Sequence, residues 1–163
     1  MPTLICGETD HLSMDEVQCQ VRGVFVAISA GGPVPAVILD IGEDACVPIF
    51  IGLWEAVSIN NALNNEVTPR PLTHDLFVNL MERCGTVMKA LSIDSLDDGV
   101  FYAKMVLVRG EDEEELDCRP SDGIAVAIRC GAKIFLDQSV VRSSSIRTED
   151  LPRFTGLNSY LNG

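Results

Sequence analysis

The clearest structural pattern in this chain lies in the segment Val17-Gln18-Cys19-Gln20-Val21-Arg22-Gly23-Val24-Phe25-Val26. Apolar and polar residues alternate along it until the pattern blurs near Gly23, which predicts a half-buried strand with a bulge. Two further apolar segments, 36–39 and 46–51, follow after glycine-containing turns at 31–33 and 42–44. Together the three segments predict a β-meander.

After Gly52 the apolar residues recur at helical spacing and predict a first helix, which ends near an asparagine cluster at 60–65. Two prolines then hold the chain extended up to Thr73, which we expect to be the N-cap of a second helix over 74–84. The apolar side chains of that second helix are spaced to form one stripe, so the helix is expected to pack on the sheet.

A hairpin is predicted next, with strands at 86–93 and 100–108 joined around Asp97-Asp98-Gly99. The run of acidic residues at 111–115 is interpreted as a solvated tip. A short strand at 116–118 is expected to follow this tip.

Ser121 is predicted to cap a third helix that ends at Gly131, with Asp122 near the positive end of the helix dipole. The apolar residues 134–136 then form a last strand. These elements predict an α+β fold, in which about three helices pack on a mixed β-sheet.

Length and composition favour a single domain. The chain has 163 residues, of which 47% are hydrophobic and 22% charged, so it can bury a core without a disulfide or a metal. We expect this domain to cover residues 16–146. Residues 1–15 are interpreted as an N-terminal leader and residues 147–163 as a peripheral C-terminal tail.

The charge balance is strongly acidic, because 12 Lys and Arg residues face 24 Asp and Glu residues, for a net charge of −12. Such a charge repels nucleic acid at long range and gives no general basic footprint. A local basic face can still form if the arginines gather. Those available are Arg70, Arg109, Arg119, Arg129, Arg142, Arg147 and Arg153.

The six cysteines show no Cys-x-x-Cys spacing, which argues against a zinc ribbon or a redox motif and favours free thiols in a reducing compartment. No apolar run approaches the ~20 residues of a membrane span. The first residues also lack the pattern of a signal peptide. We therefore expect a cytoplasmic protein without a membrane partner.

Three polar islands interrupt the apolar pattern, whereas phosphate loops, zinc motifs and nucleophile elbows do not occur. The two longer islands each contain an Arg-Pro pair, a hydroxyl residue near a helix start and an acid in the first helical turn. The islands are Gly52-Leu53-Trp54-Glu55-Ala56, Pro69-Arg70-Pro71-Leu72-Thr73-His74-Asp75-Leu76 and Asp117-Cys118-Arg119-Pro120-Ser121-Asp122-Gly123-Ile124-Ala125.

These islands, together with Pro48-Ile49-Phe50-Ile51-Gly52, resemble the bifunctional nuclease family over about residues 17–146. The resemblance implies an α+β domain with a mixed sheet, a wedge-shaped homodimer with a groove, and nuclease activity on DNA and RNA. Gly123 stands where the family commonly has alanine. On helix propensity alone, this difference weakens the third helix by up to ~1 kcal/mol.

Hydrolysis of a phosphodiester needs an activated water, a counter-charge for the phosphate and a proton for the leaving oxygen. The catalytic residues of this hypothesis are His74, Asp75, Asp122 and Glu55. One or two Mg²⁺ or Mn²⁺ ions would have as ligands Glu55, Asp75 and Asp122. The residues expected to bind the DNA or RNA substrate are Arg70, Arg119, Ser121 and Thr73.

Every one of these residues also has a structural interpretation. Thr73 and Ser121 are most simply helix caps, the acids can complement helix dipoles, and the arginines can form ion pairs. His74 is one of two histidines in the chain and can be a structural hydrogen bonder. The alternative function is therefore a non-enzymatic, acidic, homodimeric binding module. Convergence on an open groove favours the enzyme, whereas burial and mutual pairing favour the module.

Overall fold

The computed structural model describes residues 15–163, so the leader predicted over 1–15 lies outside the described residues except for Asp15. The strands are β1 (Glu16–Ser29), β2 (Gly32–Gly42), β3 (Ala45–Phe50), β4 (Val87–Asp97), β5 (Val100–Arg109), β6 (Asp112–Cys118), β7 (Lys133–Asp137), β8 (Ile146–Arg147) and β9 (Phe154–Gly156). The helices are α1 (Leu53–Leu63), α2 (Thr73–Arg83), α3 (Pro120–Cys130), α4 (Gln138–Ser144) and α5 (Leu157–Asn162), with one 3-10 turn, η1 (Thr148–Asp150).

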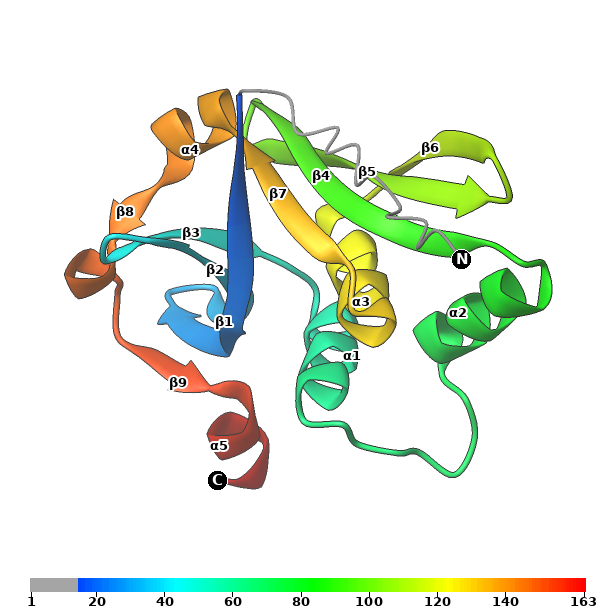
Figure 1. Cartoon of the computed structure of the whole chain (residues 1–163). Helices are drawn as coiled ribbons and strands as arrows, with labels where there is room; N and C mark the ends of the chain where they lie inside the picture. The colour runs from blue at the N-terminus through cyan, green and yellow to red at the C-terminus, as the bar shows by residue number, and fades with distance from the viewer. Residues whose placement is uncertain (1–14) are drawn as a thin grey trace, which may run out of the picture.

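The described strands form one mixed sheet in the order β6-β5-β4-β7-β1-β2-β3-β8, and β9 adds to β1 (Figure 1). Neighbouring strands pair antiparallel except β4 and β7, which are parallel. The meander β1-β2-β3 is confirmed, and the register shift between Val21 and Gly23 is the predicted bulge. The mixed sheet of an α+β domain is confirmed as well.

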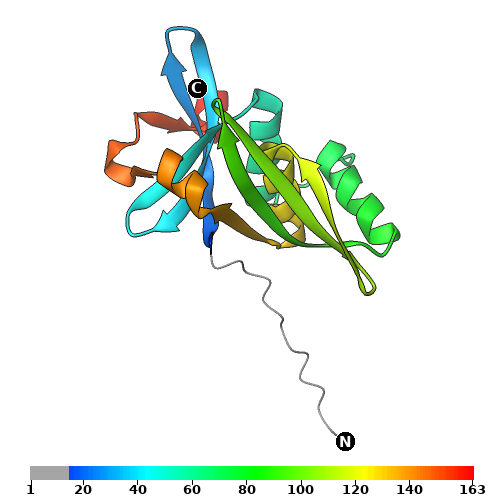
Figure 2. The same ribbon diagram turned by 90° about the horizontal axis from the view of Figure 1, so that it is seen from above.

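Helix α3 occupies the middle of a group of three helices, because it contacts both α1 and α2 and also packs on β4, β5 and β7 (Figure 1). The view from above shows the long β4–β5 hairpin running beside this helix group (Figure 2). The first turns of α1, α2 and α3 are thereby brought close together. This grouping places the polar islands, which lie at those first turns.

Gly123 allows α3 to lie close to the sheet. A Cβ atom built on Gly123 would lie 2.4 Å from Leu91 Cδ1 and 3.1 Å from Cys118 Sγ. Leu91 is fully buried, so its side chain has little room to move away. The glycine is thus a packing requirement of this chain, and its low helix propensity does not describe its net effect on stability.

The helix starts differ from the prediction in one respect. The N-cap residues are Leu72 and Arg119, so Thr73 and Ser121 lie inside the first turns and the prediction that they are caps is wrong. Asp75 accepts a hydrogen bond of 2.9 Å from the backbone N–H of Leu72 and satisfies one donor at the start of α2. Pro120 begins α3, where its fixed φ suits a first helical position.

The expectation of about three helices is too low, since the described residues contain five α-helices. Helices α4 and α5 have 7 and 6 residues, too few to show a periodic pattern in the sequence. The expectation that the tail 147–163 is peripheral is wrong for its middle part. Strand β9 pairs with β1, and Leu157 is 1% exposed within the core.

The acidic residues 111–115 are exposed to solvent as predicted, but the strand begins earlier than the predicted 116–118, because β6 pairs with β5 from Asp112 to Cys118. The side chains of β6 are mostly exposed, so its sequence lacks the alternation of apolar and polar residues by which a strand is predicted. Lysines of β4 and β5 offset part of the charge, through ion pairs from Lys89 to Glu113 and from Lys104 to Glu115. A charged edge strand also discourages association with other sheet edges.

Among residues 15–163 no helix has the length and apolar character to cross a membrane. The five cysteines of these residues are free thiols, as predicted. Burial raises the pKa of the Cys118 thiol to about 11 and that of Cys19 to about 12, so both are poor nucleophiles at neutral pH.

Candidate functional site

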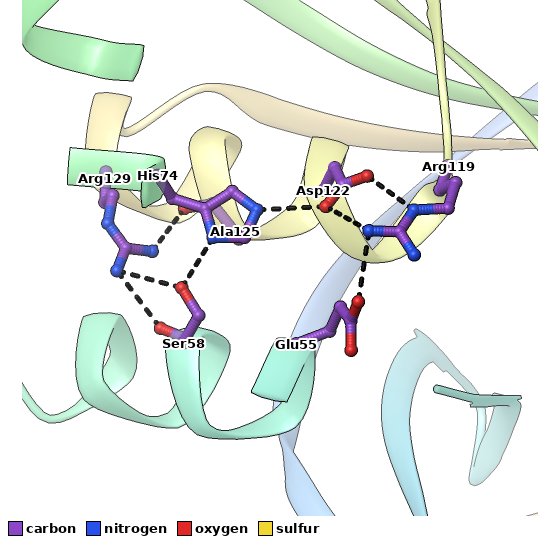
Figure 3. A network of polar contacts seen from close by, with 7 residues as sticks. All are labelled: Glu55, Ser58, His74, Arg119, Asp122, Ala125 and Arg129. Carbon is purple, nitrogen blue, oxygen red and sulfur yellow. Dashed lines mark hydrogen bonds and ion pairs between the residues drawn. The ribbon is translucent and has the colours of Figure 1, made fainter. Parts of the chain in front are cut away.

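An acid occupies the third position of each of the three grouped helices. These residues are Glu55 in α1, Asp75 in α2 and Asp122 in α3. The third position of a helix faces free backbone N–H groups and the positive end of the helix dipole, which favours a carboxylate there. Glu55 and Asp122 belong to one connected network of polar side chains across the three helices (Figure 3). Asp75 joins this network through Arg129.

The outer half of the network is built on Arg119. Its guanidinium holds Asp122 in a bidentate pair, with Nε–Oδ2 at 2.7 Å and Nη2–Oδ1 at 3.0 Å. The same Nη2 lies 3.1 Å from Oε1 of Glu55, so Arg119 links α1 to α3. The side chain of Arg119 is 65% exposed, and this guanidinium is the part of the network that a ligand in solvent reaches first.

The inner half is built on His74. Its Nε2 lies 3.0 Å from Oδ1 of Asp122, and its Nδ1 lies 2.8 Å from Oγ of Ser58. The side chain of His74 is 15% exposed, and Ser58 is buried. Both ring nitrogens therefore have partners, and the imidazole bridges a buried hydroxyl and a half-exposed carboxylate (Figure 3).

Arg129, near the end of α3, is the last cationic member of the network. Its Nε lies 2.6 Å from Oδ1 of Asp75, its Nη1 donates to the carbonyl of Ala125 at 2.8 Å, and its Nη2 donates to Ser58 Oγ at 3.2 Å. Its side chain is 11% exposed. The chain of contacts thus runs from Glu55 through Arg119, Asp122, His74, Ser58 and Arg129 to Asp75.

Asp122 and Asp75 are held in their charged form. Burial acts to raise the pKa of Asp122, but hydrogen bonds from Arg119 and His74 outweigh it and lower the pKa below the ordinary value. The pKa of Asp75 is lowered in the same way, because bonds from Arg129 and the backbone of Leu72 outweigh its burial.

Sequence reasoning finds five members of this network and misses two. His74, Glu55, Asp122 and Arg119 converge, and the remaining predicted acid, Asp75, joins through Arg129. Ser58 and Arg129 are the residues that it misses as site residues. The signal for them is helical spacing, since Ser58 follows Glu55 by three positions and Arg129 follows Asp122 by seven.

Three of the predicted substrate-binding residues lie outside the network. The side chain of Arg70 is exposed and makes no hydrogen bond or ion pair with the described residues, while its carbonyl accepts a bond of 2.6 Å from Thr68. Thr73 is exposed, and Ser121 is 6% exposed. Their role in substrate binding stays a prediction.

The three acids do not fit a Mg²⁺ or Mn²⁺ site in this arrangement. Asp122 and Asp75 each use both oxygens as acceptors, and Glu55 pairs with Arg119. Residues 15–163 contain no group of three or more His, Cys, Asp or Glu side chains placed to hold a metal ion. These carboxylates are matched to cationic side chains, so we derive no catalytic step through a metal.

Fold and site together define a small α+β domain that carries a half-exposed Arg-Asp-His cluster at the starts of three helices. The family model of the bifunctional nuclease domain matches residues 37–149, which is more than half of the chain. The chain belongs to the bifunctional nuclease domain family, and the resemblance noted from the polar islands is confirmed.

Several relatives are similar to this chain. An uncharacterised protein of Mycobacterium tuberculosis is 32% identical over 132 residues, which cover 80% of this chain and 79% of that protein. Bifunctional nuclease 2 of Oryza sativa subsp. japonica is 28% identical over 131 residues, or 77% of this chain and 40% of that protein. Bifunctional nuclease 1 of Oryza sativa subsp. indica is 27% identical over 109 residues, or 65% and 33%. The matched regions thus cover well under half of the two rice proteins.

Proposed function

We propose that this domain hydrolyses phosphodiester bonds in DNA and RNA. The observation that carries the proposal is the convergence of Arg119, Asp122 and His74 from two helix starts onto one half-exposed point. Membership of the bifunctional nuclease domain family supports the same reaction class.

Arg119 is the proposed phosphate-binding group. A guanidinium has five N–H donors in a planar fork that matches phosphate oxygens. Contacts to Asp122 and Glu55 use Nε and Nη2, which leaves Nη1 for a ligand. Because the side chain is 65% exposed, a phosphate can approach it without any rearrangement of the core. The fork also offsets the negative charge that builds up on the phosphate during the reaction.

Asp122 is the proposed acceptor for the proton of the attacking water. In this step the water oxygen forms a bond to phosphorus and a water proton passes to the carboxylate. The P–O bond to the leaving oxygen breaks, and the leaving oxygen takes up a proton from solvent. The lowered pKa of Asp122 makes it a weak base, so most of the rate acceleration is expected from positioning and from charge. His74 acts beside it through Nε2, which faces the same carboxylate at 3.0 Å and helps to hold it in place.

The experiment is cleavage of labelled single-stranded DNA and RNA by the wild-type chain, His74→Ala and Asp122→Asn, each with and without EDTA. We expect each substitution to lower the rate by about 10²-fold or more. Glu111→Gln is the matched control, since Glu111 is an exposed turn residue with no ion pair to the described residues. Cleavage that survives both substitutions would place the activity elsewhere, whereas loss of the wild-type rate in EDTA would show a metal requirement that this arrangement of the acids does not predict.

One observation favours a second function, a non-enzymatic and acidic homodimeric binding module. Every carboxylate of the network already has a cationic or hydrogen-bonding partner, as expected of side chains that hold helices together. Gel retardation at rising salt separates the two proposals, because phosphate contacts weaken steeply with ionic strength. Absence of any shift at low salt favours the module. Dimer formation and a cytoplasmic location are parts of both proposals, and sedimentation analysis tests the first of them.

A further inference from the structure

We propose that Ser58 and Arg129 are positioning residues that hold the neutral imidazole of His74 as the Nε2–H tautomer, with the proton aimed at Asp122. The role of this arrangement in catalysis rests on the proposed function. The tautomer itself follows from the hydrogen bonds alone and can be measured without any activity.

The first step concerns the nitrogen that faces Asp122. Two N–H groups of Arg119 already bond the two oxygens of this carboxylate, and the resulting ion pair keeps it ionised. An ionised carboxylate only accepts hydrogen bonds. At 3.0 Å from Oδ1, a bare lone pair on Nε2 would face a negative oxygen, so Nε2 carries the proton.

The second step concerns the opposite nitrogen. When Nε2 of a neutral imidazole carries the proton, Nδ1 has a lone pair and needs a donor. Ser58 Oγ lies 2.8 Å from Nδ1 and is the partner at that distance. Arg129 has no acceptor, so its contact of 3.2 Å with Ser58 Oγ occupies a lone pair of the hydroxyl and leaves the O–H free to point at Nδ1.

The third step concerns rigidity. Arg129 is anchored by Asp75 at 2.6 Å and by the Ala125 carbonyl at 2.8 Å. These two bonds fix the orientation of the planar guanidinium, so its Nη2 stays directed at Ser58. Ser58 is 6% exposed and Arg129 11% exposed, which keeps water from competing for these bonds. The imidazole is thus fixed at both ends, and its proton points to the half-exposed side of the network.

This arrangement assigns different roles to the two members of the pair. Neutral His74 presents an N–H rather than a lone pair toward the open side, so it cannot take a proton from water there. The proton-accepting role falls to Asp122, and His74 orients and stabilises that carboxylate. Loss of Ser58 is therefore expected to lower kcat, whereas KM, which depends on Arg119, stays close to the wild-type value.

The test is ¹⁵N nuclear magnetic resonance of the imidazole in a His11→Gln background, which leaves His74 as the only histidine. At about pH 9 an ordinary imidazole is neutral, and the ¹⁵N shifts identify the protonated nitrogen. We expect a protonated Nε2 and an unprotonated, hydrogen-bonded Nδ1. Ser58→Ala should move the Nδ1 resonance and lower kcat about 10-fold, less than the ~10²–10⁴-fold that a general acid–base group contributes, because Ser58 acts only through His74.

Two further variants keep the test decisive. Arg129→Lys retains the charge but lacks the fork that reaches Ser58 and Asp75 together, so it should also move the Nδ1 resonance. Ser143→Ala is the control, because the Ser143 hydroxyl bonds only backbone carbonyls of α4. A wild-type spectrum with the proton on Nδ1 overturns the inference even if the chain is active. An inactive chain that shows the Nε2–H tautomer overturns the nuclease proposal instead.

Discussion

The Nε2 atom of His74 lies 3.0 Å from Oδ1 of Asp122, although 48 positions separate the two residues in the sequence. The contact joins the first turn of α2 to the first turn of α3. It depends on how closely α3 approaches the sheet and on where α2 docks against α3.

Gly123→Ala is expected to destabilise the domain, although alanine is the better helix former. The new Cβ would lie 2.4 Å from Leu91 Cδ1 in a fully buried environment, and overpacking of this kind costs about 1–3 kcal/mol. Helix propensity returns up to ~1 kcal/mol, so the net change remains a loss. Urea unfolding measures the difference.

The control for Gly123→Ala is the same substitution in a Leu91→Ala background, where the crowded methyl group is absent. The two changes should be non-additive, with the alanine at position 123 costing less in the double variant. An increase in the free energy of unfolding of the single variant would contradict the packing argument.

Gly52→Ala is expected to disturb the network while it leaves the fold intact. A Cβ on Gly52 would lie 2.2 Å from Oε2 of Glu55, and the far end of that side chain can swing away at little cost. The backbone of Gly52 has φ −70° and ψ 158°, which alanine adopts freely. The swing removes Glu55 from Arg119, so the rate of nucleic-acid cleavage should change as it does in Glu55→Ala.

The measurement for Gly52→Ala is a cleavage assay beside a thermal melt, for both single variants and the double variant. We expect the double variant to behave like Glu55→Ala alone, with a Tm within a few degrees of the wild type. Fully additive effects on the rate would mean that Gly52 acts through some other contact.

Arg119→Lys is expected to separate function from stability. A lysine keeps the charge but cannot hold a carboxylate and a phosphate in a planar fork. Ion pairs this exposed contribute less than about 1 kcal/mol, so the free energy of unfolding should hardly change. The rate of oligonucleotide cleavage should fall about 10²-fold. An equal loss in Arg147→Lys, whose ion pairs lie far along the chain at η1, would show a nonspecific charge effect.

Asp75→Asn is expected to reduce the loss of stability in acid. The pKa of Asp75 is lowered in the folded chain, so its contribution to stability is present above the unfolded value near pH 4 and is lost as pH falls through the lower, folded value. The asparagine variant should be less stable at neutral pH, by about 1–3 kcal/mol, because Arg129 loses a partly buried charged partner. Its stability should also vary less with pH in acid.

Urea unfolding between about pH 2 and pH 7 measures this dependence for Asp75→Asn, with Glu111→Gln as the exposed control. The wild type and the control should show the same steep decline in acid. A decline of the same steepness in Asp75→Asn would mean that the pair with Arg129 is not a source of the acid sensitivity.

The sequence was sufficient for elements whose pattern is local. Alternation predicts β1 with its bulge near Gly23, and the hairpin turn at Asp98 and Gly99 has the positive φ values, 47° and 79°, that the Asp-Gly pair favours. The helices α4 and α5 and the full length of strand β6 could not be predicted from a local pattern. Their residues are too exposed or too few to show a period, and their structure depends on the strands and helices that they contact.

Some residues of the candidate site can be predicted from the sequence, whereas others are identified only in the folded structure. The polar islands alone identify Glu55, His74, Arg119 and Asp122, because charged side chains at helix starts stand out in an apolar sequence. Their partners come from the tertiary structure. The fold places Ser58 in contact with His74. It also leaves Arg70 outside the network, although the polar island of Arg70 has the same construction as that of Arg119.

The order of most strands and helices, and the residue types at the helix starts, can be predicted from repeats of two and 3.6 residues along the chain. Which charges meet depends on tertiary packing. A side-chain contact depends on how closely two helices pack, and that closeness is set by distant residues such as Gly123 and Leu91, which no local pattern relates.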